Sequence, residues 1–322
     1  PSFQDGSGSF AVTGAVLSGD GKTVTLTLGS VLGIDGSFSV TMNRIGNSAG
    51  QPLGNGTVGR FQTWDNDPNG VKVFILAGQS NMVGRGESER GHDDVNGAIG
   101  SLRYQVVSDN ANYGQLVVDS GNPDTDPWVV RSDVNFWWNR ADIGAGPSIS
   151  SGGLNPQGFG SGPETFGPEY GFGLTVGSAL ADEVLIIKTA WGGKSLAVDF
   201  RPPSSSGDTG PFYTVMVSKV HEVLDNLASF YPGYDGEGCE IVGFGWHQGW
   251  NDRIDAARTA EYETNLANLI RDVRAEFGVP ALPFVIANTG MADAPSGPGS
   301  LIEAQGAVSD PARYPEFDGN VT

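Results

Sequence analysis

The feature that most constrains the fold is a short apolar run, Val73 to Ala77, which ends at Gly78-Gln79-Ser80. An apolar run of this length, closed by glycine and polar residues, is typical of a strand buried on both faces, as strands of parallel sheets are. Ligands of open α/β sheets bind beyond the carboxyl ends of such strands, where Ser80 would lie. Gly78 permits a tight backbone that presents the Ser80 hydroxyl to solvent. The alternative is that Ser80 caps a following helix, because serine is a favoured N-cap residue.

The rest of the chain after residue 71 alternates strand and helix patterns, which predicts an α/β fold with a parallel sheet. The expected strands are apolar runs at 184–188, 241–246 and 283–288. The expected helices have apolar stripes of helical spacing at 170–181, 213–230 and 259–277, and a short helix is expected near 304–307. Glycines 171, 173 and 177 predict that the first of these helices packs closely on the sheet.

Residues 1–66 differ from the remainder, because they are rich in Gly, Ser, Thr and Val and carry few helix signals. Thr23–Leu28 and Phe38–Met42 alternate with period two, and turn-forming residues separate them, which is typical of a small all-β sandwich. A polar stretch at 65–70 has linker composition. We therefore expect a partial β-sandwich module at 1–66, serving as glycan or surface attachment or as a spacer, and a second domain at 67–322.

The segment 87–165 is long and rich in Gly, Asp, Asn and aromatic residues. Short strands are predicted at Leu102–Tyr104 and Trp128–Arg131. The aromatic side chains of Val134–Trp138 suggest a wall that stacks on a sugar. The alternative, which is slightly favoured, is that they pack in the core.

Charge and cysteine content exclude several functions. The chain has 37 Asp and Glu against 18 Lys and Arg, a net charge of −19, and such a surface repels nucleic acid and anionic membranes. No apolar stretch approaches the roughly 20 residues of a membrane span, and the first residues do not begin a signal peptide, so we expect any targeting segment outside this chain. The single cysteine, Cys239, excludes an intrachain disulfide and is predicted to be a buried thiol.

Four motifs follow one another in order: GQSNM at 78–82, FGPEYGFG at 166–173, LIIKTAWGGKSL at 185–196 and GFGWHQGWND at 243–252. Together they resemble the SGNH hydrolases, in the branch of sialate O-acetylesterases and related carbohydrate acetylesterases. The resemblance covers residues 71–322 and implies a three-layer α/β/α, flavodoxin-like parallel sheet. SGDGKTVTLTLGS, at 18–30, resembles bacterial Ig-like modules, which implies a secreted, periplasmic or cell-surface bacterial protein.

The resemblance also implies a serine esterase that removes O-acetyl groups from carbohydrate through an acyl-enzyme. Ser80 would be the nucleophile. The oxyanion would be held by the backbone N–H groups of Ser80 and Gly193 and by an amide side chain, from Gln248 or Asn251. The residues expected to line or support the site are Gln79, Asn81, Trp191, His247, Trp250 and Asp252. No metal or organic cofactor is required.

Two departures from the family pattern concern the acid and the base. Trp250 stands where the family usually carries the glutamate of an HQGES-like string, so one candidate triad acid is missing. The family's base belongs to a later Asp-x-x-His-like block, which does not occur before Thr322; the histidines are His92, His221 and His247. We therefore expect the base beyond Thr322, in a longer chain, with His247 as the less favoured alternative.

Two other classes of protein compete with the esterase. A noncatalytic glycan-binding or adhesion protein derived from an esterase would explain the missing histidine, but the retained GQSNM, WGG and GWND strings oppose it. A peptidase or lipase-type hydrolase is disfavoured because the chain has no G-x-S-x-G elbow and no large apolar lid. The pattern specifies neither the acetylated glycan nor the oligomeric state.

Overall fold

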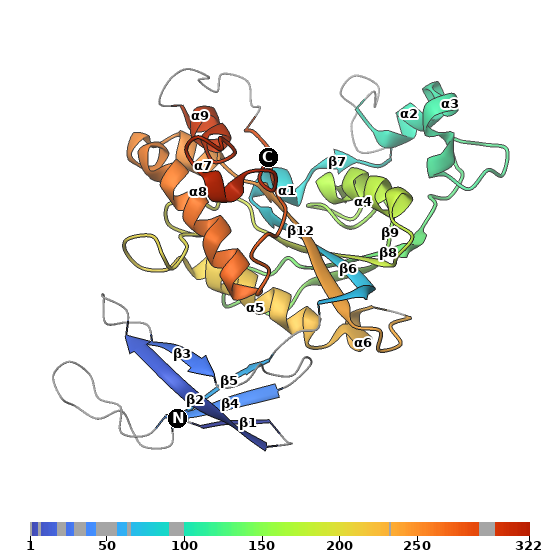
Figure 1. Cartoon of the computed structure of the whole chain (residues 1–322). Helices are drawn as coiled ribbons and strands as arrows, with labels where there is room; N and C mark the ends of the chain where they lie inside the picture. The colour runs from blue at the N-terminus through green and yellow to red at the C-terminus, as the bar shows by residue number, and fades with distance from the viewer. Residues whose placement is uncertain are drawn as a thin grey trace. The chain divides into compact units, whose positions relative to one another are not determined.

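The computed structural model describes residues 2–5, 8–17, 24–28, 37–42, 57–62, 66–89, 100–231, 233–289 and 300–322. The chain divides into two compact units, residues 1–67 and 68–322 (Figure 1). Each unit has its own sheet, so the two are described separately.

The first unit contains a five-stranded antiparallel sheet in the order β3-β2-β1-β4-β5. Its strands are β1 (Ser2–Asp5), β2 (Gly8–Leu17), β3 (Val24–Leu28), β4 (Ser37–Met42) and β5 (Thr57–Gln62). The two strands predicted from period-two alternation are β3 and β4. All the strands described here pair into this one sheet, and an Ig-like sandwich stays a prediction.

The second unit is built on a six-stranded sheet in the order β13-β12-β6-β11-β8-β9. Its strands are β6 (Asn66–Gly78), β8 (Arg131–Asn139), β9 (Ile149–Leu154), β11 (Val184–Ala190), β12 (Cys239–His247) and β13 (Phe284–Ile286). Neighbouring strands pair in parallel, except that β9 pairs antiparallel with β8 at the edge. A small separate ladder joins β7 (Gly86–Glu87) to β10 (Thr165–Phe166). The predicted α/β class with a largely parallel sheet is confirmed.

Helices flank this sheet on both faces (Figure 1). The helices are α1 (Ser80–Val83), α2 (Leu102–Ser108), α3 (Asn110–Tyr113), α4 (Pro168–Ala179), α5 (Pro211–Leu224), α6 (Leu227–Phe230), α7 (Trp250–Arg253), α8 (Ala256–Glu276) and α9 (Leu301–Ala307), with single 3₁₀ turns η3 (Gly114–Leu116) and η4 (Pro315–Phe317). On the α4 face, Phe172 contacts Phe74 of β6. On the other face, Tyr262 of α8 accepts a hydrogen bond from the Trp246 indole of β12.

The long helices follow their apolar periodicity. In α8 the predicted stripe is buried, and Asp255 caps the helix by accepting from the N–H groups of Ala257 and Arg258. The single helix predicted at 213–230 is instead two helices, α5 and α6. The break follows Asp225, and the Asn226 side chain donates to the Glu222 carbonyl, the kind of local bond that competes with a continuing helix.

The glycines of α4 serve its close packing on the sheet, as predicted, at two of three positions. A Cβ at Gly173 would lie 2.5 Å from Leu154 Cδ2, and one at Gly177 would lie 2.3 Å from Val134 Cγ2. A Cβ at Gly171 would meet nothing within 4 Å. Cys239 is buried, as predicted.

The segment 100–139 corrects two predictions. Leu102–Tyr104 is not a strand but the start of α2, because the Ser101 hydroxyl caps the helix by accepting from the Tyr104 N–H. The aromatic residues of Val134–Trp138 belong to β8, and all are buried within the sheet and its flanking layers. The substrate-wall hypothesis for these residues is therefore wrong, and they pack in the core.

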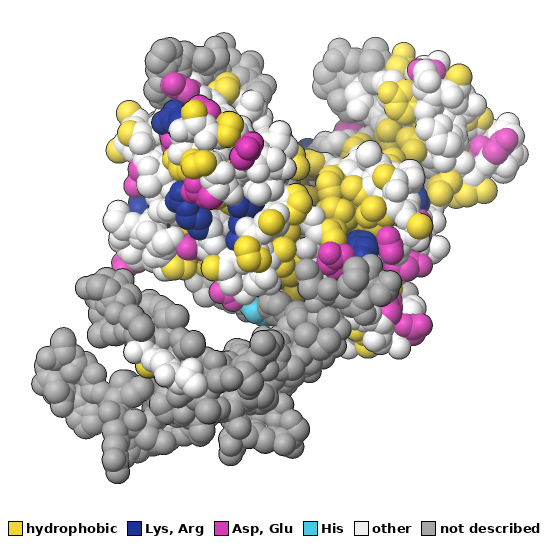
Figure 2. Space-filling view, viewed as in Figure 1, with side chains coloured by type: hydrophobic (Ala, Val, Ile, Leu, Met, Phe, Trp, Pro, Cys, Tyr) yellow, Lys and Arg dark blue, Asp and Glu magenta, His cyan; other side chains and the backbone are white. Residues whose placement is uncertain are grey.

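The surface of the second unit agrees with the composition. Acidic side chains are spread over the face seen in Figure 2, as a net charge of −19 requires. The exposed large apolar side chains include Val198, Trp250 and Ile254. No helix in the described parts of the chain is long and apolar enough to span a membrane.

Candidate active site

Ser80 lies just beyond the carboxyl end of β6, as the first residue of α1. Its side chain is exposed, whereas Gly78 and Gln79 before it are buried. Gln79 occupies the N-cap position and makes no side-chain cap, so the alternative that Ser80 caps this helix is wrong. The structure therefore presents the Ser80 hydroxyl at the sheet edge where ligands of α/β proteins bind.

Backbone contacts hold the Ser80 segment between its two neighbouring strands. The Gln79 N–H donates to the His247 carbonyl of β12 at 3.1 Å, and the Gly78 carbonyl accepts from the Trp191 N–H, after β11, at 3.2 Å. Gly78 has a φ of +152°, and a Cβ there would lie 2.2 Å from the His247 oxygen. Glycine is thus required at this position, because any side chain would push β12 away.

Gly193 and Asn251 come together at the same edge. The segment after β11 turns at Gly193, which has a φ of +73° and is exposed. The Asn251 amide, from α7, donates to the Gly193 carbonyl at 2.7 Å. Since Gly78 of β6 is paired with Ala190 of β11 and with His247 of β12, the segments carrying Ser80, Gly193 and Asn251 leave adjacent strands.

Gln248, the other candidate amide, is buried and fully hydrogen-bonded. Its Nε2 donates to the Lys194 carbonyl at 3.0 Å and to Asp252 Oδ2 at 2.6 Å. Its Oε1 accepts from the Tyr262 hydroxyl at 3.0 Å. Both hydrogens of the amide nitrogen are engaged within the protein, so Gln248 has no hydrogen left for an oxyanion.

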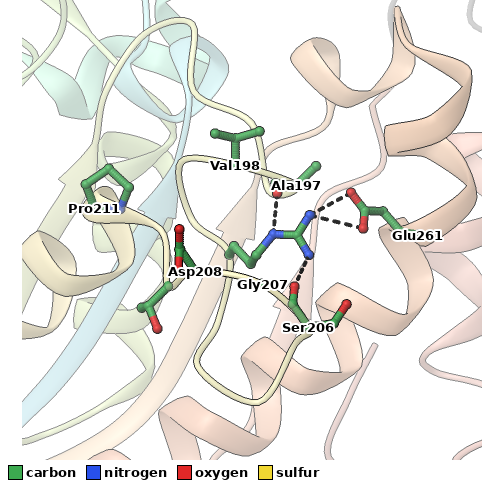
Figure 3. A pocket seen from close by; sticks show the side chains of 9 residues that line it. Ala197, Val198, Ser206, Gly207, Asp208, Pro211 and Glu261 are labelled. Carbon is green, nitrogen blue, oxygen red and sulfur yellow. Dashed lines mark hydrogen bonds and ion pairs between the residues drawn. The ribbon is translucent and has the colours of Figure 1, made fainter.

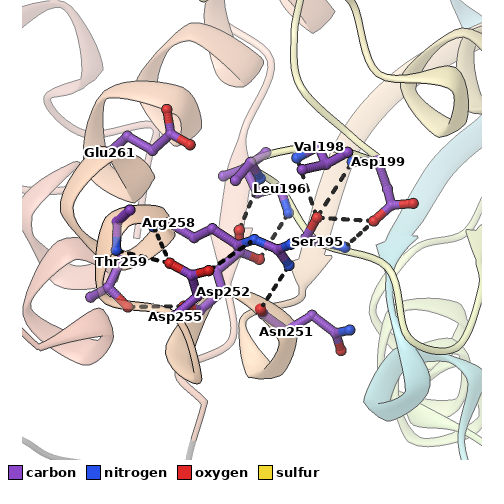
Figure 4. A network of polar contacts seen from close by, with 12 residues as sticks. Ser195, Leu196, Val198, Asp199, Asn251, Asp252, Asp255, Arg258, Thr259 and Glu261 are labelled. Carbon is purple, nitrogen blue, oxygen red and sulfur yellow. Dashed lines mark hydrogen bonds and ion pairs between the residues drawn. The ribbon is translucent and has the colours of Figure 1, made fainter.

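Asp252 links α7 to the segment after β11 (Figure 4). Its fully buried carboxylate accepts from the N–H groups of Leu196 and Ala197, each at 2.8 Å, and from Gln248. Burial raises the pKa of Asp252 above its ordinary value, and these hydrogen bonds act in the opposite direction. The carboxylate therefore supports the segment that follows Gly193 and is not exposed at the surface of the site.

The two tryptophans expected near the site differ in exposure. Trp191 is buried, donates from Nε1 to the Ala141 carbonyl at 3.0 Å, and packs against Phe212. Trp250 is 37% exposed, and the Arg253 guanidinium lies 4.1 Å from its ring centre. Of the two rings, the structure leaves only Trp250 at the surface beside Asn251. Asn81, in α1, is half-buried.

The histidines differ in how close they lie to Ser80. His247 ends β12 at the site's edge, is half-buried, and has its pKa lowered by burial. His221 lies in the last turn of α5, with Nε2 2.8 Å from Glu276 Oε1 in the last turn of α8. Helices that cross back between parallel strands end at the opposite edge of the sheet, so His221 is remote from Ser80. His92 lies outside the described residues.

Sequence reasoning missed one buried ion pair, between Lys188 of β11 and Glu169 of α4. Both side chains are 0% exposed, and Lys188 Nζ lies 2.7 Å from Glu169 Oε2. The available signal was a lysine inside an otherwise apolar strand pattern, Val184–Thr189, because a charge is rarely buried without a partner.

A surface pocket of about 500 Å³ lies between the segment after β11 and α8 (Figure 3). The Arg201 guanidinium inside it donates to the carbonyls of Ala197 and Ser206 and to Glu261. None of the candidate catalytic residues lines it. Across the described residues, no three His, Cys, Asp or Glu side chains are grouped to hold a metal ion.

The four sequence motifs lie within a stretch that matches a protein family. A family model described as "Carbohydrate esterase, sialic acid-specific acetylesterase" matches residues 70–308. Similar solved structures include an Arabidopsis thaliana protein (18% identity, 79% of this chain and 84% of that chain, TM-score 0.44). Others are XAC1771, a carbohydrate acetylesterase from Xanthomonas citri (16%, 89% and 55%, TM-score 0.41), and NanS (14%, 79% and 77%, TM-score 0.45). A comparison with curated proteins gave no match.

Proposed function

Because the chain belongs to the carbohydrate esterase family of sialic acid-specific acetylesterases, we propose that it hydrolyses O-acetyl esters of a carbohydrate through an acyl-enzyme on Ser80. One observation carries the proposal: three adjacent strands deliver Ser80, Gly193 and Asn251 to one sheet edge, with the Asn251 amide 2.7 Å from the Gly193 carbonyl oxygen. The secreted or cell-surface location expected from the first 66 residues stays a prediction.

The reaction is a two-step acyl transfer. Ser80 Oγ attacks the acetyl carbonyl carbon while a histidine takes its proton. The oxyanion is held by the N–H groups of Ser80 and Gly193 and by Asn251 Nδ2. The C–O bond to the sugar then breaks, and the sugar oxygen leaves with the proton from the histidine. Water attacks the acetyl-Ser80 ester in the same way and releases acetate.

The identity of the histidine is tested directly. A neutral imidazole accepts a proton, and the lowered pKa of His247 keeps it neutral at pH 7. If the His247→Asn variant loses activity with its fold intact, His247 is the base. If it keeps activity, His247 is not the base, and the histidine of the later block that the family resemblance implies stays the prediction.

The central experiment compares Ser80→Ala with Ser229→Ala, a matched change of an exposed serine in α6, both made in the full-length gene product so that the expected base is present. The substrates are p-nitrophenyl acetate, acetylated xylan and an O-acetylated sialic acid. We expect Ser80→Ala to lose at least about 10³-fold in rate and Ser229→Ala to match the parent. Asn251→Ala should lose about 10²–10³-fold in kcat. Equal rates for the parent and Ser80→Ala would refute the proposal.

The sugar preference distinguishes two glycan classes. A net charge of −19 disfavours an anionic glycan unless the cleft is locally basic, so the rates on acetylated xylan and on an O-acetylated sialic acid are compared directly. A parent protein that binds the glycans without hydrolysing any ester would instead support the noncatalytic binding protein.

A further inference from the structure

The buried ion pair behind the candidate site is completely hydrogen-bonded. Besides the carboxylate of Glu169, the Lys188 ammonium donates to the carbonyls of Val83, at 2.7 Å, and Phe159, at 2.8 Å. Each of its three hydrogens thus has an acceptor. The second oxygen of Glu169 accepts from the Gly167 N–H at 2.6 Å.

The three oxygens around Lys188 Nζ match the three hydrogens of a charged ammonium. A neutral amine has only two hydrogens, so an ionised Glu169 beside it would lose its donor. Burial acts against both charges, lowering the pKa of Lys188 and raising that of Glu169, while the attraction between them opposes each shift. Nearby, the Trp138 ring centre lies 4.5 Å from the ammonium.

Stability alone does not explain the pair. Burying two charges costs several kcal/mol per ion, and a buried pair often contributes no more than apolar residues of similar volume. Lys188 stands in a strand whose residues are all buried. A leucine or methionine there would pack without that cost. The role of the charge therefore lies in the backbone carbonyls that the ammonium binds.

The ammonium joins three separate segments. Val83 ends α1, Glu169 lies in the first turn of α4, and Phe159 belongs to the segment before β10. The single turn of α1 is closed by the Gly84 N–H, which donates to the Ser80 carbonyl at 3.0 Å. Fixing the Val83 carbonyl therefore fixes the turn that begins with Ser80.

The same junction is tightly packed. Gly84 has a φ of +85°, and a Cβ there would lie 2.0 Å from Gly167 Cα. A Cβ at Gly167 would lie 2.8 Å from the Val83 oxygen and 2.5 Å from Glu169 Oε2. The end of α1 and the start of α4 thus meet backbone to backbone, directly over the ion pair.

We propose that Lys188 and Glu169 are positioning residues for the nucleophile: the ion pair holds the Val83 carbonyl and so sets where Ser80 Oγ lies relative to the oxyanion donors. The inference rests on the proposed function, since it takes Ser80 as the nucleophile. β11 carries Lys188 within it and Gly193 after it, so one strand places both the Ser80 turn and an oxyanion donor. Neither side chain of the pair reaches the reacting atoms.

The test removes both charges at once, so that no charge is left buried alone. In Glu169→Gln/Lys188→Met, the glutamine can still accept from Gly167 and the methionine fills the lysine's volume. The matched control is Lys72→Met/Glu240→Gln, which removes an ion pair (2.8 Å) between the first half of β6 and the start of β12, whereas α1 follows the carboxyl end of β6. For each protein, kcat and KM on p-nitrophenyl acetate, the urea midpoint and the labelling rate of Ser80 by a fluorophosphonate are measured.

We expect Glu169→Gln/Lys188→Met to fold cooperatively, to lose about 10–100-fold in kcat, and to keep KM within about twofold, because a small displacement of a reacting group costs about that much in rate. The labelling rate of Ser80 should fall in parallel. The control should keep the parent kcat. A purely structural role would lower the urea midpoint without this kcat and labelling effect.

Two results would overturn the inference: a folded double variant with the parent kcat, or an equal loss of kcat in the Lys72→Met/Glu240→Gln control. If the double variant does not fold, Glu169→Asp, which keeps both charges but shortens the carboxylate's reach, takes its place with the same outcomes. The proposed function fails separately: it fails if Ser80→Ala is active, whereas an inactive Ser80→Ala beside a fully active pair variant defeats only this inference.

Discussion

The Asp252→Asn substitution tests how the segment carrying Gly193 is held. Asp252 Oδ2 accepts from the Leu196 N–H and the Gln248 amide, and Oδ1 accepts from the Ala197 N–H. Asparagine has the same shape but only one acceptor oxygen. Its better orientation places this oxygen at the Oδ2 position, so that its NH₂ group faces the Ala197 N–H and one hydrogen bond is lost.

The structure gives the magnitude. A hydrogen bond to a charged group contributes about 1.5–3 kcal/mol, and a buried donor left without a partner costs about 1–3 kcal/mol. Ala197 is buried, so water does not replace the lost acceptor. Removing the buried charge, whose cost is seen in the raised pKa of Asp252, offsets part of this loss. We expect a net decrease of about 2–4 kcal/mol in the free energy of unfolding.

Urea unfolding followed by circular dichroism measures this change, and amide hydrogen exchange locates it. The midpoint should fall without a change in slope, and the Ala197 amide should exchange faster. The matched control is Asp318→Asn, an exposed site, where we expect a change within about 0.5 kcal/mol. An unchanged midpoint and unchanged protection of Ala197 in Asp252→Asn would refute the idea that this carboxylate braces the segment.

Three further predictions concern the junction, pH and the core. Gly84→Ala should lower the free energy of unfolding by about 2–4 kcal/mol, since its φ of +85° and the 2.0 Å approach to Gly167 Cα both oppose a side chain. In the same urea titrations, Gly171→Ala should raise the free energy of unfolding by about 0.5–1 kcal/mol, because a Cβ there meets no atom within 4 Å. Burial lowers the pKa of His247 below 6.5, so the unfolded chain binds more protons than the folded chain just below that pH. The free energy of unfolding should therefore decrease as the pH falls from 6.5 through the folded-state pKa, by at most about 1.4 kcal/mol per pH unit. Urea titrations at several pH values measure this slope, and His247→Asn should abolish it. Phe200→Ala removes a fully buried ring that packs 5.3 Å from Trp246, and thermal unfolding should show a loss of about 3–5 kcal/mol.

The sequence by itself determined which strands end in the polar residues of the site. Runs of apolar residues closed by glycine predicted β6, β11 and β12, and placed Ser80, Gly193 and Asn251 at their carboxyl ends. These inferences succeed because hydrophobic periodicity and glycine's conformational freedom are local properties of the chain. Where a nearby side chain made the decision, as with the Ser101 cap of α2, the strand predicted at Leu102–Tyr104 was wrong.

Only the tertiary structure decided which side chains support the site and which face it. The aromatic run Val134–Trp138 became core because β8 lies beside β11 inside the sheet. The buried contacts of Asp252 with Leu196, and of Lys188 with Val83, join residues far apart in the sequence. No local pattern specifies such partners, because burial and hydrogen bonding depend on what the fold brings alongside; the free energy of a buried charge is set by those neighbours and not by the residues next to it in the chain.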